Sequence, residues 1–311
     1  MRSYISIKRR STCKEQCKAK GDSMQRIKRR IFKHDNVIYL FLLPSLIGLG
    51  VFYIVPFGIS MYYAAIDNAV SRQFVGIANL VDTWNNEAFA IAVRNTLTFM
   101  GVSIPLNMVI ALALALMLKP MRPAVRRVLL VFFLLPLVIP SGSVVFFWRS
   151  FVAYNGMFNR LFFSAAPMDW LNSDYAMWFV IMIFIWKNIG FNMILFQAGL
   201  DFIPKDYYEY AAIEGAGRIR QFFIVTLTYL GPTFLLVFIL SVVNSFKVFR
   251  EIYLLTGTHP NLNIYLLQHF LNNQFANLNY QRMASASFFT FGFIFILVLV
   301  LYALQRRQTY L

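Results

Sequence analysis

The sequence predicts an all-α polytopic membrane protein with six transmembrane helices and both termini in the cytoplasm. Hydrophobic residues make up 59% of the 311 positions and charged residues only 14%, whereas about 25% of the residues of an ordinary globular chain are charged. The mean hydropathy is +0.60, and the apolar residues gather in six long runs. This composition excludes a disordered chain, a disulfide scaffold and an ordinary soluble enzyme.

Each of the six apolar runs is long enough to cross a bilayer as a helix. A hydrocarbon core of about 30 Å needs about 20 helical residues, and a backbone in lipid must satisfy its own hydrogen bonds, which favours helices. We predict spans over residues 37–66, 95–118, 128–148, 175–200, 221–246 and 283–305. Lys187 is the only charged residue in these runs, and none of the 13 Asp and Glu residues falls within one.

The distribution of Lys and Arg predicts the sidedness. Of the 29 basic residues, 21 fall in the segments that become cytoplasmic when the N-terminus is inside, and 7 fall in the outer segments. Basic residues concentrate on the cytoplasmic side of membrane proteins. The predicted cytoplasmic segments are 1–36, 119–127, 201–220 and the C-terminus 306–311, and the outer ones are 67–94, 149–174 and 247–282.

The tail 1–36 alone carries 12 basic residues of a chain whose net charge is +16. Because few aromatic residues are interleaved with these charges, we expect the tail to bind anionic membrane lipid and not nucleic acid. Cys13 and Cys17 have no second cysteine pair, so we interpret them as reduced cytoplasmic thiols and not as metal ligands. Met24 is an alternative start, and no function is assigned to residues 1–23.

Polar residues inside the spans are candidates for a substrate path. A charge or an amide is costly in lipid and is expected to face other helices or a water-filled cavity. Asn188 and Asn192, four residues apart, share one helix face. The asparagines also suit hydrogen bonds between helices, so both interpretations stay open. The candidate path residues are Trp148, Trp186, Lys187, Asn188, Asn192 and Asn244.

The segment 201–220 predicts a short helix, a glycine turn and a second short helix. Pro204 followed by acidic Asp206 and Glu209 is typical of a first helical turn, where negative charge opposes the positive end of the dipole. Gly215 and Gly217 then permit a sharp turn with positive φ. A short amphipathic helix at the membrane face is suited to dock into the groove of a partner protein.

The same segment resembles the EAA loop of bacterial ABC-importer permeases, in the carbohydrate-uptake branch that includes the maltose and glycerol-phosphate permeases. That pattern is Glu-Ala-Ala, three residues, Gly, nine residues and Ile-x-Leu-Pro. It is matched here by Glu209, Tyr210, Ala211, Gly215, Val225 and Leu227, with Tyr210 replacing an alanine and Thr228 the proline. Segments 74–79, 186–204 and 256–260 also resemble this branch, and the resemblance covers about residues 37–305.

The resemblance implies the fold of a type I ABC-importer permease in the bacterial inner membrane. It also implies three kinds of partner: a second homologous permease subunit, two cytoplasmic ATPase subunits and an extracytoplasmic substrate-binding protein. ATP and Mg²⁺ would be bound by the ATPases, and this chain would bind no cofactor or metal. The implied ATPase-coupling loop contains Glu209, Tyr210, Ala211, Glu214 and Gly215, and the implied cargo is an oligosaccharide or another sugar that crosses by alternating access.

Two other functional classes are weighed against an ATP-driven importer. An ion-coupled secondary transporter typically needs carboxylates within the membrane, and none lies in a predicted span. An integral-membrane enzyme would need clustered catalytic groups, and no such cluster is indicated among three histidines. We expect His259 and His269 to be solvated in an outer loop. The sequence also lacks the Gly-x4-Gly-Lys-Ser/Thr phosphate loop that would bind ATP on this chain.

Overall fold

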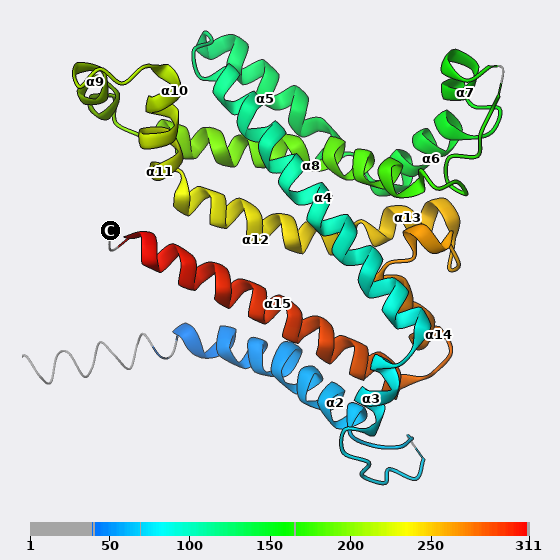
Figure 1. Cartoon of the computed structure of the whole chain (residues 1–311). Coiled ribbons are helices and arrows are strands. Elements are labelled where there is room, and N and C mark those ends of the chain that lie inside the picture. The colour runs from blue at the N-terminus through cyan, green and yellow to red at the C-terminus, as the bar shows by residue number, and fades with distance from the viewer. Residues whose placement is uncertain (1–38, 40, 69, 165, 310–311) are drawn as a thin grey trace, which may run out of the picture. The chain divides into compact units, whose positions relative to one another are not determined.

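The structure is a computed structural model that describes residues 39, 41–68, 70–164 and 166–309, with the backbone alone for 304–309 (Figure 1). Its regular elements in these ranges are helices, and one isolated bridge joins Ile66 to Phe74. The tail 1–36, with Cys13, Cys17 and Met24, lies outside the described residues. The chain divides into two compact units, Met1–Tyr62 and Tyr63–Leu311.

Six candidate membrane spans occur among the described residues when one bent helix pair is taken as a span, which confirms the predicted all-α polytopic fold, while the cytoplasmic placement of both termini stays a prediction. They are Phe41–Ala64, Glu87–Leu118, the pair Pro123–Val138 and Ser141–Phe162, Ala176–Asp201, Gly231–Thr256 and Tyr280–Ala303. The second begins eight residues before the predicted residue 95, because the helix continues beyond the apolar run to a cap in which the Asn86 side chain accepts from the Phe89 N–H at 3.0 Å.

The first span lies mostly in the first unit and changes its helical geometry near a proline. The π-helix η1 (Gly50–Ile54) precedes α2 (Val55–Ala64), and the Val55 N–H donates to the Gly50 carbonyl. Pro56 has no N–H to donate. A π-turn directly before a proline is one of the local adjustments by which a membrane helix accommodates the missing hydrogen bond.

Helix α8 (Ala176–Asp201) is central to the second unit. It packs against α4 (Glu87–Leu118), α5 (Pro123–Val138) and α12 (Gly231–Lys247), and α4 crosses both α8 and α12 (Figure 1). Phe99 and Phe184 meet edge to face where α4 contacts α8, with ring centroids 5.3 Å apart. Gly190 permits the close approach of α5, since a Cβ at this position would lie 2.0 Å from the Phe133 carbonyl oxygen.

The ends of this bundle differ in what they carry. Helices α9 (Lys205–Ile213) and α10 (Arg218–Gln221) follow the C-terminal end of α8, and α15 (Tyr280–Thr309) ends on the same side (Figure 1). After α10 the chain continues as the π-helix η2 (Phe222–Thr226) and α11 (Leu227–Tyr229). Helices α6 (Ser141–Val152), α7 (Met157–Phe162) and α13 (Phe249–Thr256) lie toward the opposite end.

The segments at that opposite end pack closely. Helix α3 (Ala78–Trp84) contacts α15, and η3 (Leu262–Ile264) and α14 (Leu267–Ala276) contact α4. The Thr96 hydroxyl accepts from the Leu267 N–H at 2.9 Å. The expectation of a solvated His269 was wrong: its side chain is fully buried, with Nδ1 accepting from the Leu266 N–H. Burial lowers the pKa of His269 to about 4, because it disfavours the charged form.

Candidate functional site

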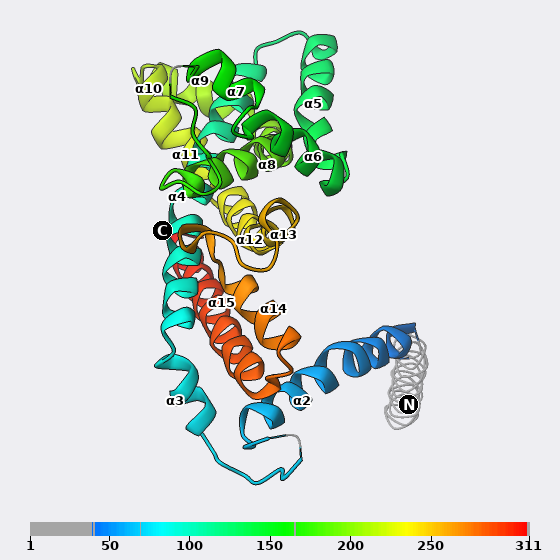
Figure 2. The same cartoon turned by 90° about the vertical axis from the view of Figure 1, so that its right-hand side faces the viewer.

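The third span is broken, and the break positions a polar side chain. Helix α5 ends at Val138, α6 begins at Ser141, and the two helices meet at 90° (Figure 2). Ile139 and Pro140 are extended between them, since a proline has no N–H to donate and disfavours the helical conformation of the preceding residue. The sequence predicted one span over 128–148, and the structure divides it into two helices.

Ser141 takes part in a buried charge network at this break. Lys187 of α8 forms an ion pair with Glu251 of α13 and donates to the Ser141 hydroxyl at 3.0 Å. Ser141 in turn donates to the Glu251 carboxylate at 2.9 Å. The two charged side chains are 15% and 6% exposed. Such charges must be paired and hydrogen-bonded to be tolerated, and here each partner supplies that pairing.

Glu251 lies beyond the predicted end of the fifth span. The fifth candidate span runs from Gly231 to Thr256 and includes it, whereas the predicted span ended at 246. The apolar run stops before Lys247, but the helical conformation continues through α13.

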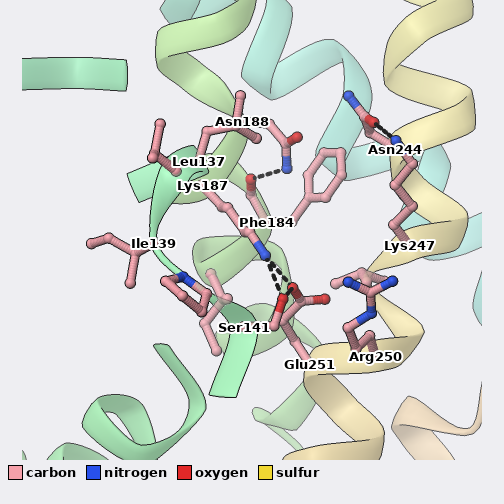
Figure 3. Close-up of a pocket in the computed structure, with 14 residues that line it drawn as sticks. Leu137, Ile139, Ser141, Phe184, Lys187, Asn188, Asn244, Lys247, Arg250 and Glu251 are labelled. Atoms are coloured by element: carbon pink, nitrogen blue, oxygen red, sulfur yellow. Dashed lines mark hydrogen bonds and ion pairs between the residues drawn. The ribbon is translucent and has the colours of Figure 1, made fainter. Parts of the chain in front are cut away.

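The charge network forms one wall of a cavity of about 300 Å³ (Figure 3). Its lining comes from the α5–α6 break, from α8 and from the α12–α13 span. Asn188 and Asn244 contribute amides, with Asn188 donating to the Phe184 carbonyl at 2.9 Å and Asn244 accepting from Lys247 at 2.9 Å. The lining residues are Leu137, Val138, Ile139, Pro140, Ser141, Ile183, Phe184, Lys187, Asn188, Asn244, Lys247, Val248, Arg250 and Glu251.

Three of the six predicted path residues line this cavity, and three do not. Lys187, Asn188 and Asn244 lie in its wall. Asn192 instead donates to the Ser241 hydroxyl of α12 at 3.0 Å, which is the hydrogen bond between helices that the sequence left as an alternative. The Trp148 and Trp186 rings pack edge to face, 5.6 Å apart, in a neighbouring cluster with Phe179.

The helix–turn–helix predicted for 201–220 is present. Helix α9 ends at Ile213, and α10 begins at Arg218. Gly215 has φ +79°; its N–H donates to the Ala212 carbonyl at 3.0 Å, and the Ala216 N–H donates to the Ala211 carbonyl at 2.9 Å. This pair of bonds is a Schellman motif, which favours glycine at the left-handed position. Gly217 has φ −66°, so the prediction of positive φ there was wrong.

One face of α9 is anchored to the bundle and the other is exposed. The Tyr208 hydroxyl bonds the Thr226 hydroxyl at 2.9 Å, and the Lys119 ammonium lies 4.8 Å from the Tyr208 ring centroid. Tyr210 is 64% exposed and Ile213 is 83% exposed. The carboxyl side chains of this segment also lie on the exposed part, with Glu209 and Glu214 both exposed. Four of the five predicted coupling residues are therefore accessible, in α9 and in the turn after it, whereas Ala211 is half-buried against the core.

A second ion pair joins α5 to the last residue of α8. Arg126 contacts the Asp201 carboxylate, and the two side chains are 25% and 48% exposed. Because Asp201 directly precedes the segment that leads to α9, this contact holds the end of α8 from which the loop departs.

Sequence reasoning missed Ser141, Lys247, Arg250 and Glu251. One signal was available for two of them. Asn244, Lys247 and Glu251 are spaced by three and four residues, which places them on one helix face. Extending the fifth helix beyond its apolar run would have brought them together. Nothing local to Ser141 indicates its two partners, which lie 46 and 110 residues away.

A family model described as "Binding-protein-dependent transport system inner membrane component" matches residues 110–310. The chain belongs to this family. It is therefore an inner-membrane permease subunit of an ABC importer and not an enzyme. The family match begins within α4, whereas the resemblance drawn from the sequence began at residue 37.

Individual relatives of this permease agree with the family assignment. It is 32% identical to the trehalose/maltose transport system permease protein MalF of Thermococcus litoralis, over 74% of this chain and 80% of that protein. It is 28% identical to the sn-glycerol-3-phosphate transport system permease protein UgpA of Yersinia enterocolitica, over 80% and 87%. The crystal structure of a bacterial ABC transporter "involved in the import of the acidic polysaccharide alginate" has the same fold, with TM-score 0.75, 22% identity and coverage of 88% and 96%.

Proposed function

We propose that this permease contributes the cavity between α5–α6, α8 and α12–α13 to a translocation path for oligosaccharides. The observation that carries this proposal is a polar cavity of about 300 Å³ in the wall of an apolar helix bundle. That volume is at the low end of small-molecule pockets, which are about 300–1,000 Å³. We expect it to accept part of a sugar chain, while a second permease closes the remaining side of the path.

The chemistry around the cavity suits a sugar. Asn188 and Asn244 lie in its wall, and an amide offers both donors and an acceptor to hydroxyl groups. The Trp148–Trp186 cluster adjoins the cavity through Ile183, which belongs to both, and aromatic rings provide apolar surfaces for the C–H faces of a sugar. The relatives are named for trehalose/maltose, glycerol 3-phosphate and alginate, so they support a sugar-like cargo without distinguishing neutral from acidic cargo.

The loop around α9 is proposed to receive one of two cytoplasmic ATPases. Its exposed carboxylates and apolar side chains form a surface suited to a partner's groove, and the Tyr208–Thr226 bond fixes the helix to the bundle. Helix α8 joins this surface to the cavity, because Lys187 and Asn188 lie on α8 and Asp201 ends it. Movement of α9 on ATP binding would be transmitted through α8, and the path would alternate its open side. An extracytoplasmic binding protein would deliver the cargo.

The decisive experiment is uptake by the complete importer, assembled with its second permease, ATPases and binding protein in vesicles. Uptake should require ATP and binding protein and should persist when a protonophore removes the ion gradient. The protonophore control is needed because Glu251 lies in the fifth candidate span, and a carboxylate within a span is also typical of an ion-coupled transporter. Uptake that persists without ATP and stops with the protonophore would reject the ATP-driven function.

The docking role of α9 has its own test. Glu209→Lys should abolish the coupling of ATP hydrolysis to uptake, because it reverses a charge on the exposed face of α9. Asp82→Lys is the matched control, since Asp82 is also exposed but lies in α3 at the other end of the unit. Equal coupling in both variants would remove the docking role.

The sidedness remains a prediction that reporters can test. A reporter fused after Lys205 should be cytoplasmic, and one fused near Asn261 should be extracytoplasmic. The structure supports this arrangement, because α9 and the end of α15 lie at one end of the second unit while η3 lies toward the other. Labelling of both reporters from the same side would contradict the six-span topology.

A further inference from the structure

The cavity carries more positive than negative charge. Three basic side chains and a single carboxylate line it: Lys187, Lys247, Arg250 and Glu251 (Figure 3). Lys187 and Glu251 neutralise each other in their ion pair. Two positive charges therefore remain, both from the fifth span.

Neither remaining charge is paired with a carboxylate among the described residues. Lys247 donates to the amide oxygen of Asn244 at 2.9 Å, which is a neutral acceptor. Arg250 is exposed and forms no ion pair within the described part of the chain. A guanidinium offers a planar fork of donors that matches a carboxylate or a phosphate group. The side chains around Lys247 and Arg250 thus leave an anion-binding capacity unused.

The break in the third span adds to the positive potential. Ser141 is the first residue of α6 and lies in the cavity wall. The first N–H groups of a helix have no intrahelical acceptor, and the N-terminal end of the helix dipole favours negative charge. This end of the 12-residue α6 therefore faces the same space as the two cations.

We propose that the cavity selects sugars that bear an anionic group, with Lys247 and Arg250 binding that group and the amides binding neighbouring hydroxyls. The inference rests on the proposed function and narrows its cargo from sugars in general to acidic ones. A carboxylate, as in a hexuronate, and a phosphate ester present the same chemistry to these two residues.

A cargo explains the two cations better than a lipid headgroup does. The cavity wall also holds the nearly buried Asn188 and the buried Lys187–Glu251 pair. A headgroup bound only at the exposed cations would not contact these deeper polar residues of the wall. A sugar with hydroxyls beside its anionic group uses both kinds of lining.

The test uses the complete importer in vesicles and matched pairs of probes. Each pair contains a disaccharide with one hexuronate unit and the same disaccharide with its carboxyl reduced to the alcohol, in the glucose, galactose and mannose series. Disaccharide phosphates are tested beside the hexuronate probes and their neutral counterparts. We expect ATP-dependent uptake of an acidic probe in preference to its neutral counterpart, and the uronate and phosphate arms distinguish the two anionic groups.

Variants then assign the selectivity to this cavity. Lys247→Gln and Arg250→Gln should each lower uptake of the acidic probe by about tenfold, the loss expected for one charge-assisted hydrogen bond of about 1.4 kcal/mol. Arg250→Lys should retain more uptake than Arg250→Gln. Arg160→Gln is the control, because Arg160 is an exposed residue of α7 outside the cavity, and it should leave uptake unchanged.

Several outcomes would overturn the inference while leaving the proposed function standing. Preference for the neutral probes, or equal loss of acidic and neutral uptake in the Gln variants, would show that Lys247 and Arg250 do not select the cargo by its charge. An effect that vanishes in vesicles of phosphatidylcholine alone would assign them to an anionic lipid headgroup. Dissociation of the complex would assign them to a carboxylate on the second permease. Absence of ATP-dependent uptake of any sugar would instead reject the proposed function.

Discussion

Replacing Glu251 by Gln is expected to destabilise the permease far more than replacing Asp201 by Asn, although each change removes one carboxylate from an ion pair. The Glu251 side chain is 6% exposed and its partner Lys187 is 15% exposed, whereas the Arg126–Asp201 side chains are 25% and 48% exposed. Breaking a buried pair leaves an uncompensated charge and costs about 3–5 kcal/mol. An exposed pair contributes about 0–1 kcal/mol.

The assay is thermal unfolding of the purified complex. At roughly 2–4 °C per kcal/mol for chains of 150–250 residues, Glu251→Gln should lower the unfolding midpoint by about 6 °C or more. Asp201→Asn should lower it by no more than about 4 °C. The double variant Lys187→Met, Glu251→Leu should recover much of the loss, because removing both charges leaves neither one unpaired.

The interpretation of a buried, mutually dependent pair has clear ways to fail. The midpoints of Glu251→Gln and Asp201→Asn would be equal if water reached the Lys187–Glu251 pair freely. Additive effects of the Lys187 and Glu251 substitutions would mean that the two side chains do not stabilise each other, since contacting residues give non-additive free energies in a double-mutant cycle.

The remaining predictions concern two glycines, each with another glycine as its control, and one histidine. Gly215→Val should lower the stability by about 1–3 kcal/mol and uncouple ATP hydrolysis from uptake. Gly217→Val should do neither, because both sites have open space but only Gly215 has positive φ. Equal ratios of ATP hydrolysis to uptake in the two variants would refute this prediction. Gly190→Ala should lower the stability by about 1–3 kcal/mol or more, since its Cβ would clash with a carbonyl oxygen of α5. Gly101→Ala is the control, because a Cβ there meets no atom within 4 Å. Equal yields of folded protein for the two variants would contradict this prediction. The unfolding midpoint should fall as the pH drops from about 6.5 to about 4, because His269 takes up a proton in the unfolded chain more readily than in the folded protein, where it is buried. His269→Gln should flatten this pH dependence. A pH profile that is the same in the variant would show that His269 does not cause it.

Local rules predict much of this molecule. Length and hydropathy give six spans, because a helix that crosses lipid must be long, apolar and internally hydrogen-bonded. The turn after α9 was predicted from Gly215, because glycine is favoured at the left-handed position that closes a helix. These features depend on residues close together in the sequence, and their prediction needed no knowledge of which helices are neighbours.

Contacts between distant segments were not predicted from the sequence. Asn192 meets a hydroxyl of α12 while Asn188, one turn earlier, lines the cavity, and the sequence places both on the same helix face. His269 lies in a polar stretch and yet is buried against Phe249 of the fifth span, with ring centroids 4.7 Å apart. Which face of a helix meets which partner depends on packing, and that information is spread over the whole chain.

The structure departs from the predicted spans at two places, the break at Pro140 and the helix that continues past residue 246, and both lie at the cavity. Hydropathy detects neither a bend at Pro140 nor the continuation of a span past its first charge. The bend places Ser141 where it bonds both Lys187 and Glu251, and this pairing makes a carboxylate in the fifth candidate span tolerable. A run of polar residues spaced by three and four at the end of an apolar helix, such as Asn244, Lys247 and Glu251, therefore indicates that the helix continues with one polar face. Such a polar face is stable in the membrane only beside matching groups or water. Residues such as Ser141 and Glu251, at the points where the helices depart from the predicted spans, therefore mark the position of the cavity.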